Sequence, residues 1–145
     1  AADPVTRYLE ILRSLIGSGR AHLAAKDGGE PVRASASCGW RIEGDRCVPK
    51  GECVGWLCGA DVYIEPSTAF RLVQIANRDM GDNLGITEQT LRKRLKERGA
   101  LASTDEARET ITVRRTIAGS SRAVLHFHRG MIIPDGDNAE GETDA

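Results

Sequence analysis

One helix with both ends marked in the sequence constrains the fold of this chain more than any other segment. Thr87 is a suitable N-cap, because its hydroxyl can accept a hydrogen bond from a backbone N–H of the first turn. Ile86 and Leu91 have the spacing of a hydrophobic staple, which fixes how the chain enters a helix. Gly99 follows the last periodic residue, where a left-handed residue commonly ends a helix. The sequence therefore predicts a helix between residues 87 and 99.

This helix has a narrow apolar stripe and a basic surface. Leu91 and Leu95 share one side at about 100° per residue. Five cations lie between Arg92 and Arg98, and the only carboxylate among them is that of Glu97. Such a surface fits a polyanion, but the same residues also suit an ordinary solvated helix. The helix alone does not separate the two interpretations.

The chain begins with a second predictable helix. Asp3 can cap it, Pro4 fits its first position, and apolar residues recur at helical spacing through residues 4–16. Gly17-Ser18-Gly19 ends the pattern.

Residues 20–65 lose the helical periodicity and predict a β region. Short β-favouring runs alternate there with Gly, Asp and Pro signals, at residues 21–25, 39–42, 53–57 and 62–64. Trp56 and Tyr63 flank a turn, so we expect them to be cross-strand neighbours. Aromatic residues are only 4% of the chain, and we therefore expect Trp40 and Trp56 to anchor the core rather than to stack on nucleic-acid bases.

The region after residue 65 has the element order of a winged helix. A helix beginning at Pro66 and the basic helix form a helix-turn-helix pattern over residues 66–99, and the first of the two carries its apolar residues at Phe70, Val73, Ala76 and Met80. Two alternating segments follow, 110–117 and 122–128, and predict a β-hairpin within 110–129. In a winged helix, the second helix of the motif enters the major groove and the hairpin touches flanking DNA.

We therefore expect an α+β fold: a winged helix-turn-helix with an additional small antiparallel β-sheet inserted before the helix-turn-helix. Residues 1–134 should form a single domain, and residues 135–145 should form an acidic disordered tail.

The net charge of −1 hides a segregation of charge along the 145 residues. Residues 71–129 hold 12 basic and 7 acidic side chains, whereas residues 130–145 hold 5 acidic and no basic ones. The basic part coincides with the helix-turn-helix and the hairpin, which favours DNA as the partner. The chain has no apolar run near the roughly 18 residues of a transmembrane helix, and no signal peptide is visible. We expect a cytoplasmic protein without a membrane partner.

Two groups of side chains are the predicted DNA contacts. On the basic helix, Gln89 and Arg92 suit the edges of adenine and guanine. On the hairpin, arginines can neutralise backbone phosphates without reading sequence. The predicted DNA-binding residues are Thr87, Gln89, Arg92, Lys93, Lys96, Arg114, Arg115 and Arg122.

The segment from Leu84 to Asp105, continued by residues 112–117 and 122–126, resembles the C-terminal region of primase- or helicase-like replication ATPases of actinobacteria, phages and plasmids. The stretches at 55–56, 61–66 and 69–70 resemble the segment that precedes it in those proteins. The resemblance implies an accessory DNA-binding module of a larger replication protein of a mobile element, with other domains or subunits of that ATPase as partners. The chain has no Gly-x-x-x-x-Gly-Lys-Ser/Thr loop, so ATPase chemistry would have to lie outside it.

Catalytic and metal-binding patterns are sparse. His126 and His128 should share one strand face, but no carboxylate or thiol lies close in sequence to complete a metal site, and we expect polar residues on the outer face of the hairpin. The four cysteines, at 38, 47, 53 and 58, match no common zinc module, and we expect buried free thiols. A disulfide or a zinc site remains an alternative, and a zinc-stabilised domain is the third interpretation. We expect neither an enzyme nor a cofactor. The alternative function is a winged-helix module that binds a protein partner instead of DNA.

Overall fold

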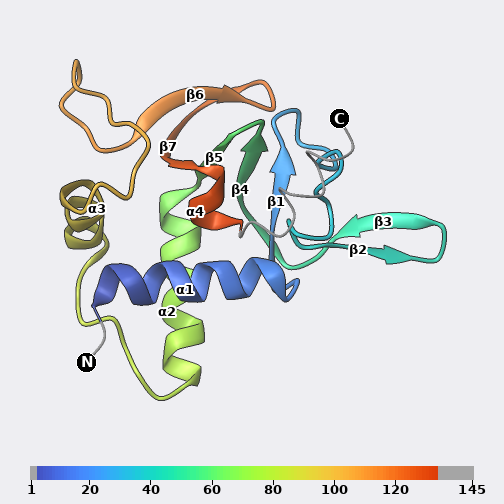
Figure 1. The fold of residues 1–145 in the computed structure, drawn as a ribbon, viewed down its shortest axis with the longest axis horizontal. Helices are drawn as coiled ribbons and strands as arrows, with labels where there is room; N and C mark the ends of the chain where they lie inside the picture. Colours follow the sequence, from blue (N-terminus) through green and yellow to red (C-terminus); the bar gives the residue numbers. More distant parts are fainter. Residues whose placement is uncertain (1–2, 134–145) are drawn as a thin grey trace.

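The computed structural model describes residues 3–133 (Figure 1). The predicted tail at 135–145 lies outside the described residues. The helices are α1 (Pro4–Gly17), α2 (Pro66–Asp79), α3 (Glu88–Glu97) and α4 (Arg129–Ile132). The strands are β1 (Ala21–Ala25), β2 (Trp40–Glu43), β3 (Arg46–Pro49), β4 (Glu52–Cys58), β5 (Asp61–Ile64), β6 (Val113–Ile117) and β7 (Ser120–His128). The expected α+β class is confirmed for the described part of the chain.

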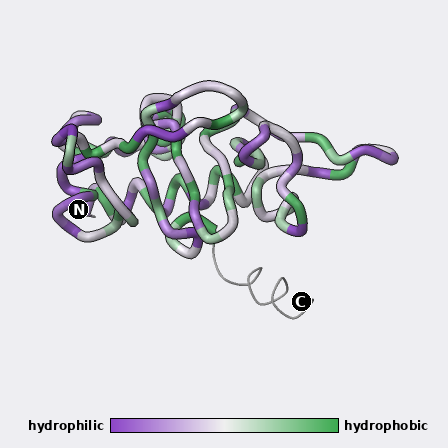
Figure 2. The backbone as a smooth tube through the Cα atoms, turned by 90° about the horizontal axis from the view of Figure 1, so that it is seen from above, coloured by the Kyte–Doolittle hydropathy of each residue, from purple (hydrophilic) through white to green (hydrophobic). Residues whose placement is uncertain are grey.

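Five of these strands form one sheet in the order β1-β4-β5-β7-β6. β1 runs parallel to β4, and each of the other neighbours is antiparallel. Trp56 pairs with Tyr63 across β4 and β5, which confirms them as cross-strand neighbours. β2 and β3 form a separate two-stranded hairpin, the arm, which Figure 2 shows projecting from the body of the molecule.

The larger hydrophobic core joins α1, α2 and α3 to one face of the sheet. Leu12 and Ile16 of α1, Val73 of α2 and Leu95 of α3 meet Phe127 of β7 in this cluster, and all of them are buried. This burial is the main source of stability that apolar side chains offer, at about 25 cal/mol for each Å² removed from water.

A smaller core lies on the opposite face of the sheet. Its buried members are Ala24, Trp56, Tyr63, Val113, Ile117 and Val124. The β6–β7 hairpin curls over this face, and the backbone N–H of Ala118 at its tip donates to the carbonyl of Lys26, after β1, at 2.9 Å. Figure 1 shows β6 arching above the sheet toward the end of β1. The sheet is therefore covered on both faces.

The caps predicted at Asp3 and Thr87 are confirmed, and the structure adds a third cap at Glu65. Each of the three long helices has its N-cap side chain accepting a backbone N–H: Asp3 from Thr6, Glu65 from Thr68 and Thr87 from Thr90. The helices begin where these residues indicate because a carboxylate or hydroxyl there satisfies a backbone donor that the first turn leaves unpaired.

Three expectations about the fold are wrong. The β region is not a separate inserted sheet, because β1, β4 and β5 join the same sheet as the predicted wing. Met80 follows α2 and is 58% exposed, because the chain turns at Gly81 before that side chain can reach the core. β6 begins at Val113 rather than at residue 110, since residues 105 and 110 instead bridge each other in a tight turn of their own.

Candidate nucleic-acid interface

Two leucines seat α3 on the domain. Leu91 is 1% exposed and Leu95 is fully buried, and the hydroxyl of Thr87 accepts the N–H of Thr90 at 3.1 Å. Gly99 has φ +69°, the left-handed conformation expected at the end of this helix. The predicted helix and its buried seam are therefore confirmed. The remaining surface of α3 is turned outward.

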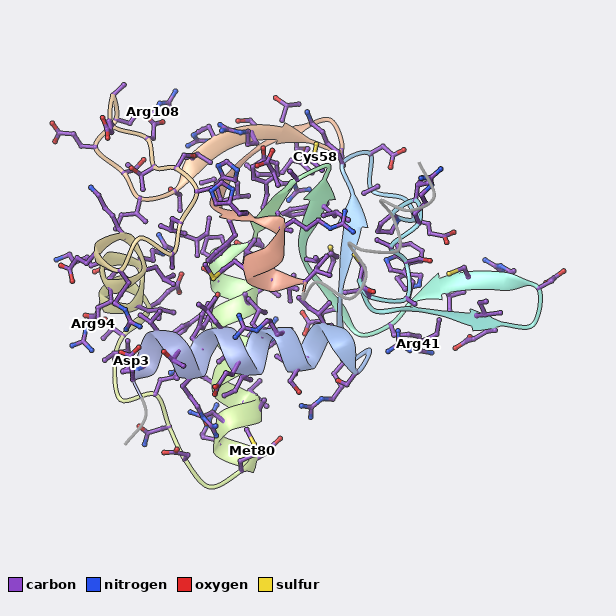
Figure 3. All side chains as sticks on the ribbon, in the orientation of Figure 1. Asp3, Arg41, Cys58, Met80, Arg94 and Arg108 are labelled. Atoms are coloured by element: carbon purple, nitrogen blue, oxygen red, sulfur yellow. The ribbon has the colours of Figure 1, made fainter. Side chains whose placement is uncertain are left out.

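Ion pairs divide the five cations of α3 and its C-cap into two groups. Arg92 is paired with Glu88 at 2.5 Å and is only 29% exposed, and Arg98 is paired with Asp3 of the α1 cap. Lys93, Arg94 and Lys96 are exposed and make no ion pair with a carboxylate in residues 3–133. In Figure 3 the side chain of Arg94 points outward at this end of the molecule. The free positive charge of α3 thus comes from three side chains.

Asp3 connects this surface to α1. Its hydrogen bond with Arg98, together with the backbone N–H of Thr6, lowers the pKa of the Asp3 carboxyl from its usual range. The ion pair is exposed, so its contribution to stability is small. It nevertheless occupies Arg98 and removes that cation from the set available to a partner.

A hollow of about 370 Å³ separates α3 from the loop that follows it. Gln89, Arg92 and Lys93 line one side, and residues 109–112 of the α3–β6 loop (residues 100–112) line the other. The outer turn of the loop is closed by two backbone hydrogen bonds of 3.0 Å between Asp105 and Thr110. Glu109 adopts φ +57°, which is uncommon for a residue with a side chain. The hollow combines amide, cationic and carboxylate groups, all suited to hydrogen bonding.

Two of the three predicted hairpin arginines cover the smaller core and do not line this hollow. Arg115 and Arg122 are directly opposite each other on β6 and β7. The guanidinium carbon of Arg115 lies 5.5 Å from the ring centroid of Tyr63, and that of Arg122 lies 5.0 Å from the ring centroid of Trp56. Both side chains are half-buried, and they cover the smaller core. Arg114 is exposed.

The structure therefore groups only part of the predicted site. Gln89, Arg92 and Lys93 share the hollow, and Thr87 and Lys96 are exposed on the same helical element. The hairpin tip does not project beside α3, because its hydrogen bond to Lys26 directs it to the other end of the sheet.

His126 has partners that sequence inspection missed. Its Nε2 lies 2.8 Å from a carboxylate oxygen of Asp61, and its Nδ1 lies 2.7 Å from the hydroxyl of Ser103. The His126 side chain is only 12% exposed, so its expected outer-face position is wrong, whereas His128 is exposed as expected. Asp61 is 65 positions away in sequence, and only the antiparallel pairing of β5 with β7 brings it close. The shared alternation of Asp61-x-Tyr63 and His126-x-His128 is the signal that could have indicated this contact.

The four cysteines form no disulfide with one another, and only Cys38 is buried as expected, because Cys47, Cys53 and Cys58 are partly exposed. Burial raises the pKa of the Cys53 thiol, which disfavours the reactive thiolate. Within residues 3–133, no group of three or more histidine, cysteine, aspartate or glutamate side chains is arranged to hold a metal ion.

None of the helices in the described residues is long and apolar enough to cross a membrane. Comparisons of the chain with protein-family models, with curated proteins and with solved structures found no match.

Proposed function

We propose that this chain is a DNA-binding module of the winged-helix type, with α3 and the α3–β6 loop as its contact surface. The observation that carries the proposal is that α3 buries an apolar side in the domain and exposes a cationic side to solvent. Two buried leucines hold the helix, and Lys93, Arg94 and Lys96 remain exposed without carboxylate partners in the described chain. A protruding helix with unpaired cations is suited to the phosphates and base edges of a DNA groove.

The order of elements supports the winged-helix comparison. α2, α3 and the β6–β7 hairpin follow one another, and β7 pairs with β5, the strand immediately before α2. The curled hairpin differs from a freely projecting wing, since its tip is bonded beside β1. The flanking contact beside α3 is therefore assigned to the α3–β6 loop and to the exposed Arg114.

Individual side chains then take different roles. Gln89 faces the hollow and is the proposed base contact, and Lys93, Arg94, Lys96 and Arg114 are the proposed phosphate contacts. Arg92 lies in the hollow but is held by Glu88, so it orients the surface more than it reads a base. Thr87 fixes the start of the helix.

The sequence resemblance extends the proposal to a biological setting. It supports an accessory module of a larger cytoplasmic replication protein, primase- or helicase-like, from a mobile element. Other domains or subunits of that ATPase would then be its protein partners.

One observation favours a protein-binding module as the second candidate. The arm carries Ile42 with 79% of its surface exposed, and Arg41 ties its base to the carbonyls of Gly17 at 2.8 Å and Ala36 at 2.9 Å. The arm and α3 lie at opposite ends of the molecule (Figures 1 and 2). A protein partner on the arm would leave the α3 surface open.

Fluorescence anisotropy with duplex, forked and single-stranded DNA, titrated with salt, tests the proposal. We expect binding that weakens steeply with salt, because phosphate contacts release counterions. The ranking of the three substrates separates a duplex reader from a module for replication forks. No binding to any of the three at low salt would refute DNA binding and leave the protein-interaction candidate.

A further inference from the structure

Three side chains from distant parts of the chain form a hydrogen-bonded row on one face of the sheet. Asp61 begins β5, His126 lies in β7, and Ser103 lies in the α3–β6 loop. The Asp61 carboxylate lies 2.8 Å from Nε2 of His126, and the Ser103 hydroxyl lies 2.7 Å from Nδ1 of the same imidazole. The row is a hydrogen-bonded side-chain connection between the sheet and the loop that lines the hollow, in addition to the apolar packing of Leu101 and Ile111 on the larger core.

The chemistry of the row assigns each hydrogen bond a direction. An ionised carboxylate only accepts, so Nε2 of a neutral His126 carries the proton and donates it to Asp61. Nδ1 is then the acceptor, and the Ser103 hydroxyl donates to it. Asp61 therefore fixes the tautomer of His126 whose Nδ1 can accept a hydrogen bond from the Ser103 hydroxyl.

The same region has a backbone connection. The N–H of Ala102 donates to the carbonyl of His126 at 2.7 Å. Beyond residue 103, the loop's own closure is the pair of bonds between Asp105 and Thr110. The Ser103–His126 bond is thus the last sheet contact before the segment that faces α3.

We propose that His126 is a positioning residue, which holds the α3–β6 loop in the orientation that completes the hollow beside α3. This inference rests on the proposed DNA-binding function. Asp61 acts through His126, and Ser103 is the point where the loop is held. The groups around the imidazole fit a structural role: Tyr63 lies 5.0 Å and His128 lies 6.4 Å from it, ring to ring, and Arg115 covers the Tyr63 ring.

A serine, an imidazole and a carboxylate in a row are also the parts of a hydrolytic triad. The exposures favour positioning instead, since the carboxylate is 40% exposed whereas the imidazole is nearly buried. Ser103 also forms an antiparallel backbone bridge with His126 of β7, so the serine end of the row lies where the loop is held to the sheet.

Two amide substitutions of His126 separate its two hydrogen bonds. His126→Asn puts a carbonyl oxygen near the Nδ1 position, so it can retain the hydrogen bond from the Ser103 hydroxyl. His126→Gln puts an N–H near the Nε2 position, so it can retain only the hydrogen bond to Asp61. Ser103→Ala removes the loop contact without changing the sheet, and serves as the second variant should a histidine variant not fold. Circular dichroism establishes that each variant is folded.

Hydrogen exchange at the Ala102, Asp105 and Thr110 amides is the first readout, with the Ala118 amide at the hairpin tip as the internal control. We expect His126→Gln and Ser103→Ala to speed exchange at the three loop amides by about fivefold, the effect of one typical hydrogen bond, and His126→Asn to stay close to the wild type. Ala118 should be unchanged in every variant. Equal exchange in Asn and Gln variants, or no change in Ser103→Ala, would overturn the positioning role.

Duplex DNA affinity is the second readout. We expect the dissociation constant to rise by about fivefold in the variants with a released loop and to stay unchanged in His126→Asn. Faster loop exchange with unchanged affinity would overturn the link to binding, and labelling of Ser103 by a fluorophosphonate would overturn the structural assignment. Failure of the wild type to bind DNA would refute the proposed function, and exchange alone would then decide whether His126 holds the loop.

Discussion

Removing charge from α3 should change the salt dependence of DNA binding by a predictable amount. Lys93, Arg94, Lys96 and Arg114 are the four proposed contacts with exposed cations and no carboxylate partner in the described residues. Each phosphate neutralised on duplex DNA contributes about −0.9 to the slope of log affinity against log salt. If each cation neutralises one phosphate, the wild-type slope should be about −3.6.

The perturbation is the double variant Lys93→Gln and Lys96→Gln. Glutamine and lysine have similar helix propensity, so α3 should remain intact. The slope should fall to about −1.8. Between 50 and 200 mM salt, affinity should then decrease about 12-fold, compared with about 150-fold for the wild type.

A matched control removes the same net charge at the other end of the sheet. Arg20→Gln with Lys26→Gln changes two exposed cations next to β1, and its slope should equal that of the wild type. The assay is fluorescence anisotropy with one duplex at four or more salt concentrations. Equal slopes for the α3 variant and the control would refute the assignment of phosphate contacts to α3.

Five further substitutions test individual contacts. Arg114→Ala should reduce the magnitude of the salt slope by about 0.9 without changing the free energy of unfolding. Arg122→Ala should leave the salt slope unchanged and should lower the free energy of unfolding in urea by about 1 kcal/mol, because the cation–π contact with Trp56 is lost. Leu95→Ala should lower the free energy of unfolding by about 2–5 kcal/mol, since the side chain is fully buried; a cost near zero would show that α3 does not depend on this seam. Asp3→Asn keeps an N-cap but removes the charge paired with Arg98, the ion pair that lowers the pKa of the Asp3 carboxyl. The loss of stability relative to wild type, measured by urea unfolding, should be complete at neutral pH and should disappear as the pH falls below about 4, because the wild-type carboxyl then protonates. A stability difference that persists at low pH would contradict this. Glu109→Gln should strengthen duplex DNA binding about twofold to fivefold at low salt, because a carboxylate on the wall of the hollow repels phosphate. Weaker binding of this variant in fluorescence anisotropy would instead indicate that Glu109 contacts a base.

Local signals in the sequence predicted the elements of the fold well. The caps at Asp3, Glu65 and Thr87 mark the helix starts because each depends on a side chain three positions from the amide it binds. The Ala118-Gly119 turn is also a local signal, and φ is positive at both residues. Such interactions join residues that are close in the sequence, so the sequence alone can predict them.

Pairings between distant segments were not predictable in the same way. β1 and β4 pair in parallel with the whole arm between them, and no periodicity specifies that partner. The curl of β6–β7 depends on one backbone bond to Lys26, which side-chain patterns do not encode. His126 appeared isolated for the same reason, since its carboxylate partner comes from another strand.

The candidate site illustrates the difference between counting charges and placing them. The sequence presents five cations in and just after the basic helix and three in the hairpin, and all eight look equally available. The ion pairs of Arg92 and Arg98 and the ring contacts of Arg115 and Arg122 occupy four of them. A cation that is already paired or stacked must give up that interaction to bind a phosphate, so its net contribution is smaller. Because half of the cations are occupied, the salt slope expected from the structure is about half of what the charge count alone would give.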